Sequence, residues 1–188
     1  MEAEDLMPRH LLGVVTIAGT ALALAGCATT GVSSHVRSGL DFTKYSTFEW
    51  GTPDPFPVGD PRLDKNPIFL DYVYGAIEKQ MVAKGYERTG TNRPDLLIHF
   101  HANIDRRLNV KASDARRGYC LDDSCRAGVE EYEAGTLIVD VIDRRTDRLI
   151  WRGWAQNSVE GVLEDRDRLV RLIENGVARM FVSLPPAR

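Results

Sequence analysis

The chain has 188 residues, of which 43% are hydrophobic and 27% are charged, and its formal net charge is −3. These fractions are typical of a globular protein and exclude a chain that is disordered throughout. The small net charge gives no support to nucleic-acid binding or to electrostatic attachment to a membrane surface.

An apolar run from Leu11 to Ala25 is the first feature of the chain. It is too short for a bilayer-spanning helix, which needs about 20 residues, but it suits the apolar region of a signal peptide. It ends in Leu24-Ala25-Gly26-Cys27, which resembles the lipobox of bacterial lipoproteins. The resemblance implies that residues 1–26 are a signal peptide and that Cys27 carries a lipid. The alternative is that the run forms a buried helix of the domain.

A lipid on Cys27 implies firm anchoring, because stable attachment takes more than one acyl chain and the resemblance implies several. In such lipoproteins an aspartate after the cysteine tends to retain the protein at the inner membrane, whereas this chain has Ala28. We therefore expect an outer-membrane lipoprotein on the periplasmic side. Residues 27–40 are predicted to be the lipidated cysteine and a flexible tether, and residues 41–188 a single periplasmic domain.

The domain is expected to begin with a strand. Asp41 to Trp50 alternates in polarity, with Phe48 and Trp50 on one face. Five prolines between residues 51 and 67 then exclude a helix or a central strand.

A helix is predicted next, with Asn66 as its N-cap, Pro67 as its first residue and Gly85 at its end. Apolar residues at helical spacing make its buried stripe. They are Phe69, Leu70, Val73, Ile77 and Met81.

The middle of the chain is predicted to be mostly strand. Asp95 to Asp105 alternates strictly and predicts a strand with one apolar face. Residues 106–134 are predicted to be a long charged loop, and loops of that length are often functional. Residues 135–142 and 149–155 then read as two strands joined by a turn at residues 143–147.

A final helix is expected to begin after Asp165 or Asp167 and to end at Leu184, before two prolines. Two helices with one-sided apolar stripes can both pack on one face of a sheet. We therefore predict an α+β fold, a two-layer sandwich of about four strands with two helices on one face, in the order β-α-β-β-β-α.

Two cysteines remain besides Cys27. Cys120 and Cys125 are close in sequence, and an exported domain meets an oxidising compartment in which such pairs usually form a disulfide. The small loop would be stabilised by about 2 kcal/mol or less. The alternative is a metal site that uses both thiolates with Asp122 and Asp123.

Several phrases of the sequence together resemble one bacterial lipoprotein family. They are Asp41-Phe-Thr-Lys-Tyr-Ser-Thr-Phe-Glu-Trp50, Lys84-Gly-Tyr86, Pro94-Asp-Leu-Leu-Ile98, Gly135-Thr-Leu-Ile-Val-Asp-Val-Ile-Asp143 and Leu149-Ile-Trp-Arg-Gly-Trp-Ala155. In this order they look like the family of domain of unknown function 4136, over about residues 40 to 185. The resemblance implies an envelope lipoprotein with no established activity, so no catalytic residue is carried over.

His99 and His101 form the first candidate site. Residues two apart on a strand share a face, so both imidazoles could reach one metal ion, with Asp105 or the cysteine loop completing the site. The alternative is a solvated sheet face opposite the helices, since two ligands are too few for a closed metal site.

Asp140, Arg152 and Trp154 complete the candidate binding face. A register that places Asp140 opposite Arg152 leaves a turn of plausible length, and the pair is then either a charged spot in a groove beside His101 or an exposed ion pair of small net stability. Trp154 is expected on the same face, either as part of a docking patch or covered by the long loop. The apolar neighbours expected there are Ile138, Ile142 and Ile150.

Trp50 and Trp151, in contrast, are expected in the core. A basic stretch in the long loop is either a solvated surface or a contact for anionic lipid headgroups or lipopolysaccharide phosphates. It comprises Arg106, Arg107, Lys111, Arg116 and Arg117.

No nucleophile–base set, phosphate loop or metalloprotease motif is recognisable. We therefore expect a membrane-anchored lipoprotein whose periplasmic domain binds another envelope component, a protein or a lipid component, without a cofactor. A metal-binding module through His99 and His101 is the first alternative, and an envelope enzyme is the second.

Overall fold

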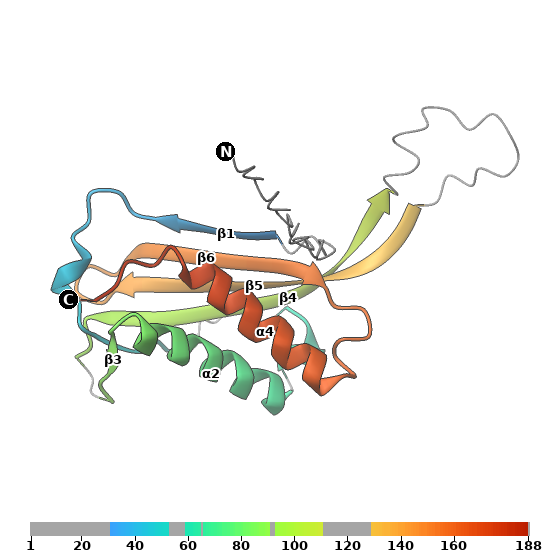
Figure 1. Cartoon of the computed structure of the whole chain (residues 1–188), viewed down its shortest axis with the longest axis horizontal. Helices are drawn as coiled ribbons and strands as arrows, with labels where there is room; N and C mark the ends of the chain where they lie inside the picture. The colour runs from blue at the N-terminus through green and yellow to red at the C-terminus, as the bar shows by residue number, and fades with distance from the viewer. Residues whose placement is uncertain (1–30, 53–58, 65, 91–92, 111–128, 188) are drawn as a thin grey trace, which may run out of the picture.

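A computed structural model describes residues 31–52, 59–64, 66–90, 93–110 and 129–187. Six strands form one mixed sheet in the order β1-β6-β5-β4-β2-β3 (Figure 1). The strands are β1 (Gly31–Val36), β2 (Thr47–Trp50), β3 (Glu87–Arg88), β4 (Leu96–Val110), β5 (Val129–Asp143) and β6 (Arg148–Ser158). Strand β2 is parallel to β3 and β4, and the other pairings are antiparallel.

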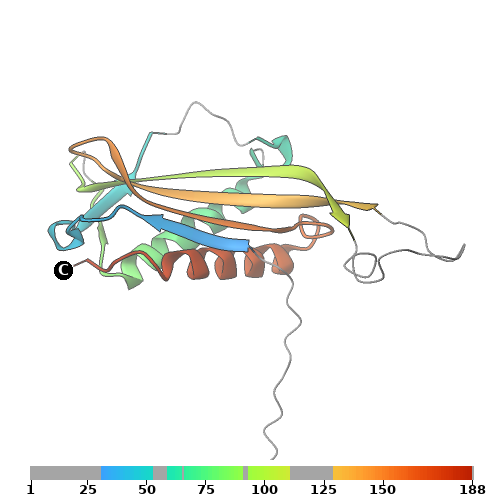
Figure 2. The same ribbon diagram turned by 90° about the horizontal axis from the view of Figure 1, so that it is seen from above.

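Helices cover one face of this sheet. They are the short α1 (Pro61–Asp64), α2 (Pro67–Ala83) and α4 (Arg166–Phe181), and a 3-10 turn, η1 (Phe42–Lys44), precedes β2. Both long helices lie on the same side of the sheet, as Figures 1 and 2 show. Over the described part of the chain no helix covers the other face, which we call the open face.

The predicted four-stranded sheet with two helices in the order β-α-β-β-β-α is wrong. The sheet has two further strands, β1 and β3, and α1 is a third helix. Strand β3 has two residues and α1 has four, which is too short for a periodic pattern. The prolines of residues 51–67 also do not exclude α1, because Pro61 is its first residue, where no backbone N–H is needed.

The predicted tether at residues 27–40 is wrong for its described part, because Gly31–Val36 form strand β1. Residues 31–36 pair with β6 from Gly31 opposite Gln156 to Val36 opposite Trp151. Val32 and Val36 pack against the core, while the residues between them are small or polar. An edge strand with two apolar side chains gives a weak signal, which is why the segment resembles a linker.

The predicted loop at residues 106–134 is too long, because β4 continues to Val110 and β5 begins at Val129. Their pairing continues to Val110 opposite Val129, whereas β6 ends at Ser158 opposite Ala134. The ends of β4 and β5 therefore leave the sheet as a two-stranded ribbon (Figure 1). Arg106, Arg107 and Leu108 are exposed there, so this part lacks the buried face that produces an alternating pattern.

Both predicted ends of α2 and the predicted start of α4 at Asp165 are confirmed, whereas α4 ends at Phe181, before the predicted end at Leu184. Asn66 caps α2 by accepting the N–H of Phe69 at 3.1 Å, and Pro67 is the first helical residue. Gly85 follows the helix with a φ of +88°, in the left-handed region. Asp165 caps α4 by accepting the N–H of Arg168 at 3.0 Å.

The core lies between the sheet and the two long helices. Trp151 is fully buried, as predicted, whereas Trp50 is only partly buried. The Trp151 ring lies over Gly153, where an added Cβ would be 2.4 Å from the ring. Its indole nitrogen donates to Ser183 Oγ at 3.0 Å, which ties β6 to the end of α4.

Two carboxylates fix the beginning of β2 on the sheet. Asp95 accepts the backbone and hydroxyl hydrogens of Ser46 and Thr47, and these bonds lower its pKa although burial opposes the shift. Asp143 is buried and accepts the Tyr45 hydroxyl at 2.9 Å. Burial and this carboxylate raise the pKa of Tyr45 well above its ordinary value.

Candidate functional site

A row of four polar residues crosses the open face. His35 on β1 is opposite Arg152 on β6, Arg152 is opposite Asp140 on β5, and Asp140 is opposite His99 on β4. The predicted register between Asp140 and Arg152 is therefore confirmed, and His99 is brought beside it. We call these residues the polar row.

The centre of the polar row is a bidentate ion pair. Arg152 donates from Nε to Asp140 Oδ1 at 2.6 Å and from Nη2 to the other oxygen. This hydrogen bonding raises the pKa of Arg152, against the effect of burial. The Asp140 side chain is 7% exposed and that of Arg152 is 44% exposed. The pair is thus not fully solvated, because its carboxylate is buried and only the guanidinium reaches solvent.

The His99 ring lies directly against the backbone of the segment that follows β2. A Cβ added at Gly51 would be 1.8 Å from His99 Nε2, so a larger residue at this position would force the His99 ring to move. The Gly51 N–H also donates to the Ile98 carbonyl at 3.0 Å, which holds this segment beside β4. One edge of the imidazole is therefore covered by protein.

A second row runs beside the polar row. Ser33, Trp154, Ile138 and His101 follow each other across β1, β6, β5 and β4. Trp154 is 36% exposed, which is unusual for the largest apolar side chain. The predicted neighbour Ile150 is not on this face, because a bulge in β6 opposite Val141 and Ile142 places it in the core.

Hydrogen-bonding side chains extend the open face towards the ribbon. Gln156 donates to the Thr136 hydroxyl at 2.8 Å, and Asn103 donates to Asp105 at 2.8 Å. Sequence reasoning missed His35 and Gln156. His35 was hidden because β1 resembles a tether, and Gln156 because the predicted strand ended one residue earlier.

His99 and His101 share the open face, as two residues apart on a strand should. Among the described residues no group of three or more His, Cys, Asp or Glu side chains could hold a metal ion. Cys120 and Cys125 lie outside the described residues, so the disulfide and the alternatives that use this loop stay predictions.

The basic stretch lies partly inside and partly outside the described residues. Arg106 and Arg107 are exposed on the ribbon of β4 and β5. Lys111, Arg116 and Arg117 lie outside the described residues. Its contact with anionic lipids therefore stays a prediction.

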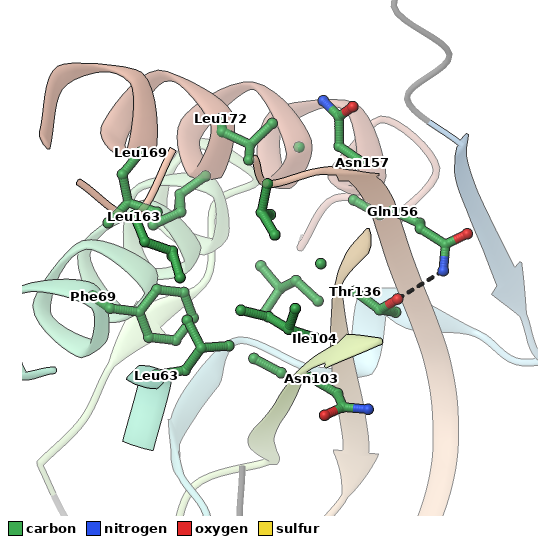
Figure 3. A pocket seen from close by; sticks show the side chains of 17 residues that line it. Leu63, Phe69, Asn103, Ile104, Thr136, Gln156, Asn157, Leu163, Leu169 and Leu172 are labelled. Carbon is green, nitrogen blue, oxygen red and sulfur yellow. Dashed lines mark hydrogen bonds between the residues drawn. The ribbon is translucent and has the colours of Figure 1, made fainter. Parts of the chain in front are cut away.

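An apolar pocket lies on the other side of the sheet, under α4. Its volume is about 70 Å³, and it is partly open to solvent. Figure 3 shows the side chains of Leu63, Phe69 and Leu172 directed into it, whereas Asn103 and Gln156 point away. We call it the helix-side pocket, and no pattern in the sequence predicted it.

Small residues on three neighbouring strands leave room for this pocket. Ala102, Gly135 and Ala155 form part of its floor on β4, β5 and β6. Helix α4 comes closest to the floor at Gly176, where an added Cβ would be 3.3 Å from the Ala155 Cβ. Towards its N-terminus, Leu172 and Leu169 of the helix form the roof of the pocket.

A family model for the domain of unknown function DUF4136 matches residues 32–186. The chain belongs to this family. The predicted family resemblance is therefore confirmed, and the match includes β1, which lies before the predicted start of the domain. No curated protein matches the chain by sequence.

Two of the solved structures that match the chain share its fold. A DUF4136 family protein from Bacteroides thetaiotaomicron matches 80% of this chain and 95% of its own, with 13% identity and a TM-score of 0.51. A PDZ domain protein from Parabacteroides distasonis matches 82% of this chain with 20% identity and a TM-score of 0.51. This chain spans only 35% of that protein. At these identities the likeness extends to the fold alone.

Among the described residues, no helix is long and apolar enough to cross a membrane.

Proposed function

We propose that this protein is a lipid-anchored lipoprotein of the outer membrane whose periplasmic domain binds another envelope component through the open face. The observation that carries the proposal is the exposure of the Trp154 side chain. It is 36% exposed on a sheet face that no described helix covers, between Ser33 on β1 and Ile138 on β5.

The anchor is supported by the sequence at the start of the chain. Cys27 ends a lipobox-like motif, and β1 begins only four residues later at Gly31. Four residues span at most about 14 Å, so an anchored domain would sit close to the bilayer. Its partner would therefore be a component that also lies near the membrane.

The composition of the open face favours binding over catalysis. Asp140, its most buried carboxylate, is engaged by Arg152 through two hydrogen bonds rather than directed at an open site. Trp154 offers a large apolar area with a polar N–H, a combination enriched at protein interfaces. We assign no catalytic residue and no cofactor.

The experiment that tests the binding face compares two exposed apolar residues of β6. Trp154→Ala removes the proposed contact, and Leu149→Ala is the control, since Leu149 is 37% exposed at the other end of the strand. Each variant is expressed with its leader, crosslinked in intact cells and analysed by mass spectrometry. We expect a recurrent partner that Trp154→Ala loses and Leu149→Ala keeps. A partner retained by both variants, or none at all, refutes the binding face.

The anchor is tested separately on the native product. Intact-mass analysis should show a chain that begins at Cys27 and carries acyl groups. Cys27→Ser should abolish the added mass and release the protein from membranes. An uncut chain without lipid contradicts the proposal.

A further inference from the structure

We infer that the helix-side pocket takes the end of one acyl chain of the lipid carried by Cys27. This inference rests on the lipid anchor proposed above. It assigns an occupant to a pocket that the open-face interaction does not use.

The lining of the pocket selects an apolar occupant. The side chains directed into it are aliphatic or aromatic, and the lining residues include no charged one. Of the polar residues in the lining, Thr136 and Gln156 hydrogen-bond to each other on the open face. A lining of this kind favours an apolar occupant, because apolar surface is then removed from water.

The size of the pocket fits part of an acyl chain. Its 70 Å³ is several times the roughly 10–15 Å³ that one water molecule requires, measured in the same way. The floor at Ala102 and Ala155 is low because both residues are small, so a slender chain can lie across it. A large ring system or a folded peptide segment would exceed this space.

The position of the anchor brings an acyl chain to the pocket. Gly31, the first residue of β1, is opposite Gln156, which is one of the lining residues. Cys27 is four residues before Gly31, so its sulfur begins at most about 14 Å from this end of the strand. A tether this short gives an effective concentration in the millimolar range, at which a weak pocket is occupied.

The test places a photoreactive group in the pocket. The full chain is expressed with its leader in cells, with a short aliphatic diazirine amino acid, similar in size to leucine, in place of Leu172, which lines the pocket on α4. The matched control carries the same group in place of Leu70, a partly buried residue of α2 that does not line the pocket. After irradiation, mass spectrometry identifies crosslinks to the acylated Cys27 peptide.

We expect the crosslink from position 172 to be at least about fivefold stronger than that from position 70, given the short tether. A second variant, Ala102→Leu, fills the floor and should reduce the crosslink to the control level while circular dichroism shows a folded domain. A crosslink that is equal at both positions, that survives Ala102→Leu, or that joins only phospholipid or another protein overturns the inference. Intact mass of the same sample separates the two proposals, because an unacylated Cys27 refutes the anchor, whereas an acylated Cys27 without the crosslink refutes only the pocket.

Discussion

The ion pair between Asp140 and Arg152 gives the sharpest test of the open face. Replacing Arg152 with alanine removes both hydrogen bonds and leaves a carboxylate that is only 7% exposed without its cationic partner. Replacing Asp140 frees a guanidinium that is 44% exposed and can turn to water. We therefore expect Arg152→Ala to cost more stability than Asp140→Ala.

The magnitude follows from the burial of the two groups. Exposed ion pairs contribute about 0.2–1 kcal/mol, whereas breaking a buried pair costs about 3–5 kcal/mol. The pair has one buried and one half-exposed member, so solvent screens part of its interaction. We expect a coupling free energy of about 1–2 kcal/mol from the double-mutant cycle.

Urea unfolding of the two single variants and the double variant at pH 7 measures this coupling. The control cycle uses Lys79 and Glu174, which lie 3.6 Å apart with side chains 69% and 51% exposed. For this surface pair we expect about 0.5 kcal/mol or less. If the coupling of Asp140 with Arg152 is no larger than that of the control, the bidentate geometry and the register of β5 and β6 are both wrong.

Three further predictions concern the core, the pH dependence and the metal hypothesis. Gly153→Ala places a methyl group against the Trp151 ring and should destabilise the domain by about 1–3 kcal/mol, measured by urea unfolding, and an unchanged midpoint contradicts the packing. The pKa of Asp143 is lowered. Burial alone would raise this pKa, but the hydrogen bonds that the carboxylate accepts from the Tyr45 hydroxyl and two backbone N–H groups outweigh burial. The ionised Asp143 carboxylate therefore stabilises the folded state fully above the unfolded pKa of about 3.9. This stabilisation is lost as the pH falls through the lower pKa of the folded state. Asp143→Asn should accordingly lower stability at pH 7 by about 1–3 kcal/mol and reduce the loss between pH 7 and pH 3. Calorimetry with zinc or copper tests the metal hypothesis, which requires binding tighter than about 10 µM that His99→Ala weakens.

Elements with a strong local signal could be predicted from the sequence. The caps at Asn66 and Asp165 and the turn at Gly85 are local chemistry, since a side-chain oxygen or a positive φ is needed at one position. The pairing of Asp140 with Arg152 could also be predicted, because a short turn between two strands allows few registers. These features depend on residues close in the chain.

Elements that depend on distant pairing could not be predicted in the same way. Strand β1 gains its backbone hydrogen bonds from β6, more than 100 residues later, and its own sequence has only Val32 and Val36 to bury. In the ribbon of β4 and β5, the consecutive residues Arg106, Arg107 and Leu108 are all exposed, so no alternation in polarity marks this part of β4. The helix-side pocket depends on how α4 diverges from the floor near Gly176, which no sequence period encodes.

Several residues of the phrases that carry the family resemblance have structural roles in the fold. Asp95 and Asp143 tie the beginning of β2 to the sheet. Gly153 makes room for the ring of Trp151, which anchors the end of α4. Each of these residues has a structural reason for its chemical type.

Trp154 stands apart from this group. It belongs to the same phrase of sequence as Trp151 and Gly153, yet it is 36% exposed and is absent from the buried core. Most of its side chain is still covered, so packing accounts for part of its size, and the partner proposed above would account for the exposed part. For that reason Trp154→Ala should abolish partner capture while lowering the free energy of unfolding by no more than about 3 kcal/mol, so that the domain stays folded.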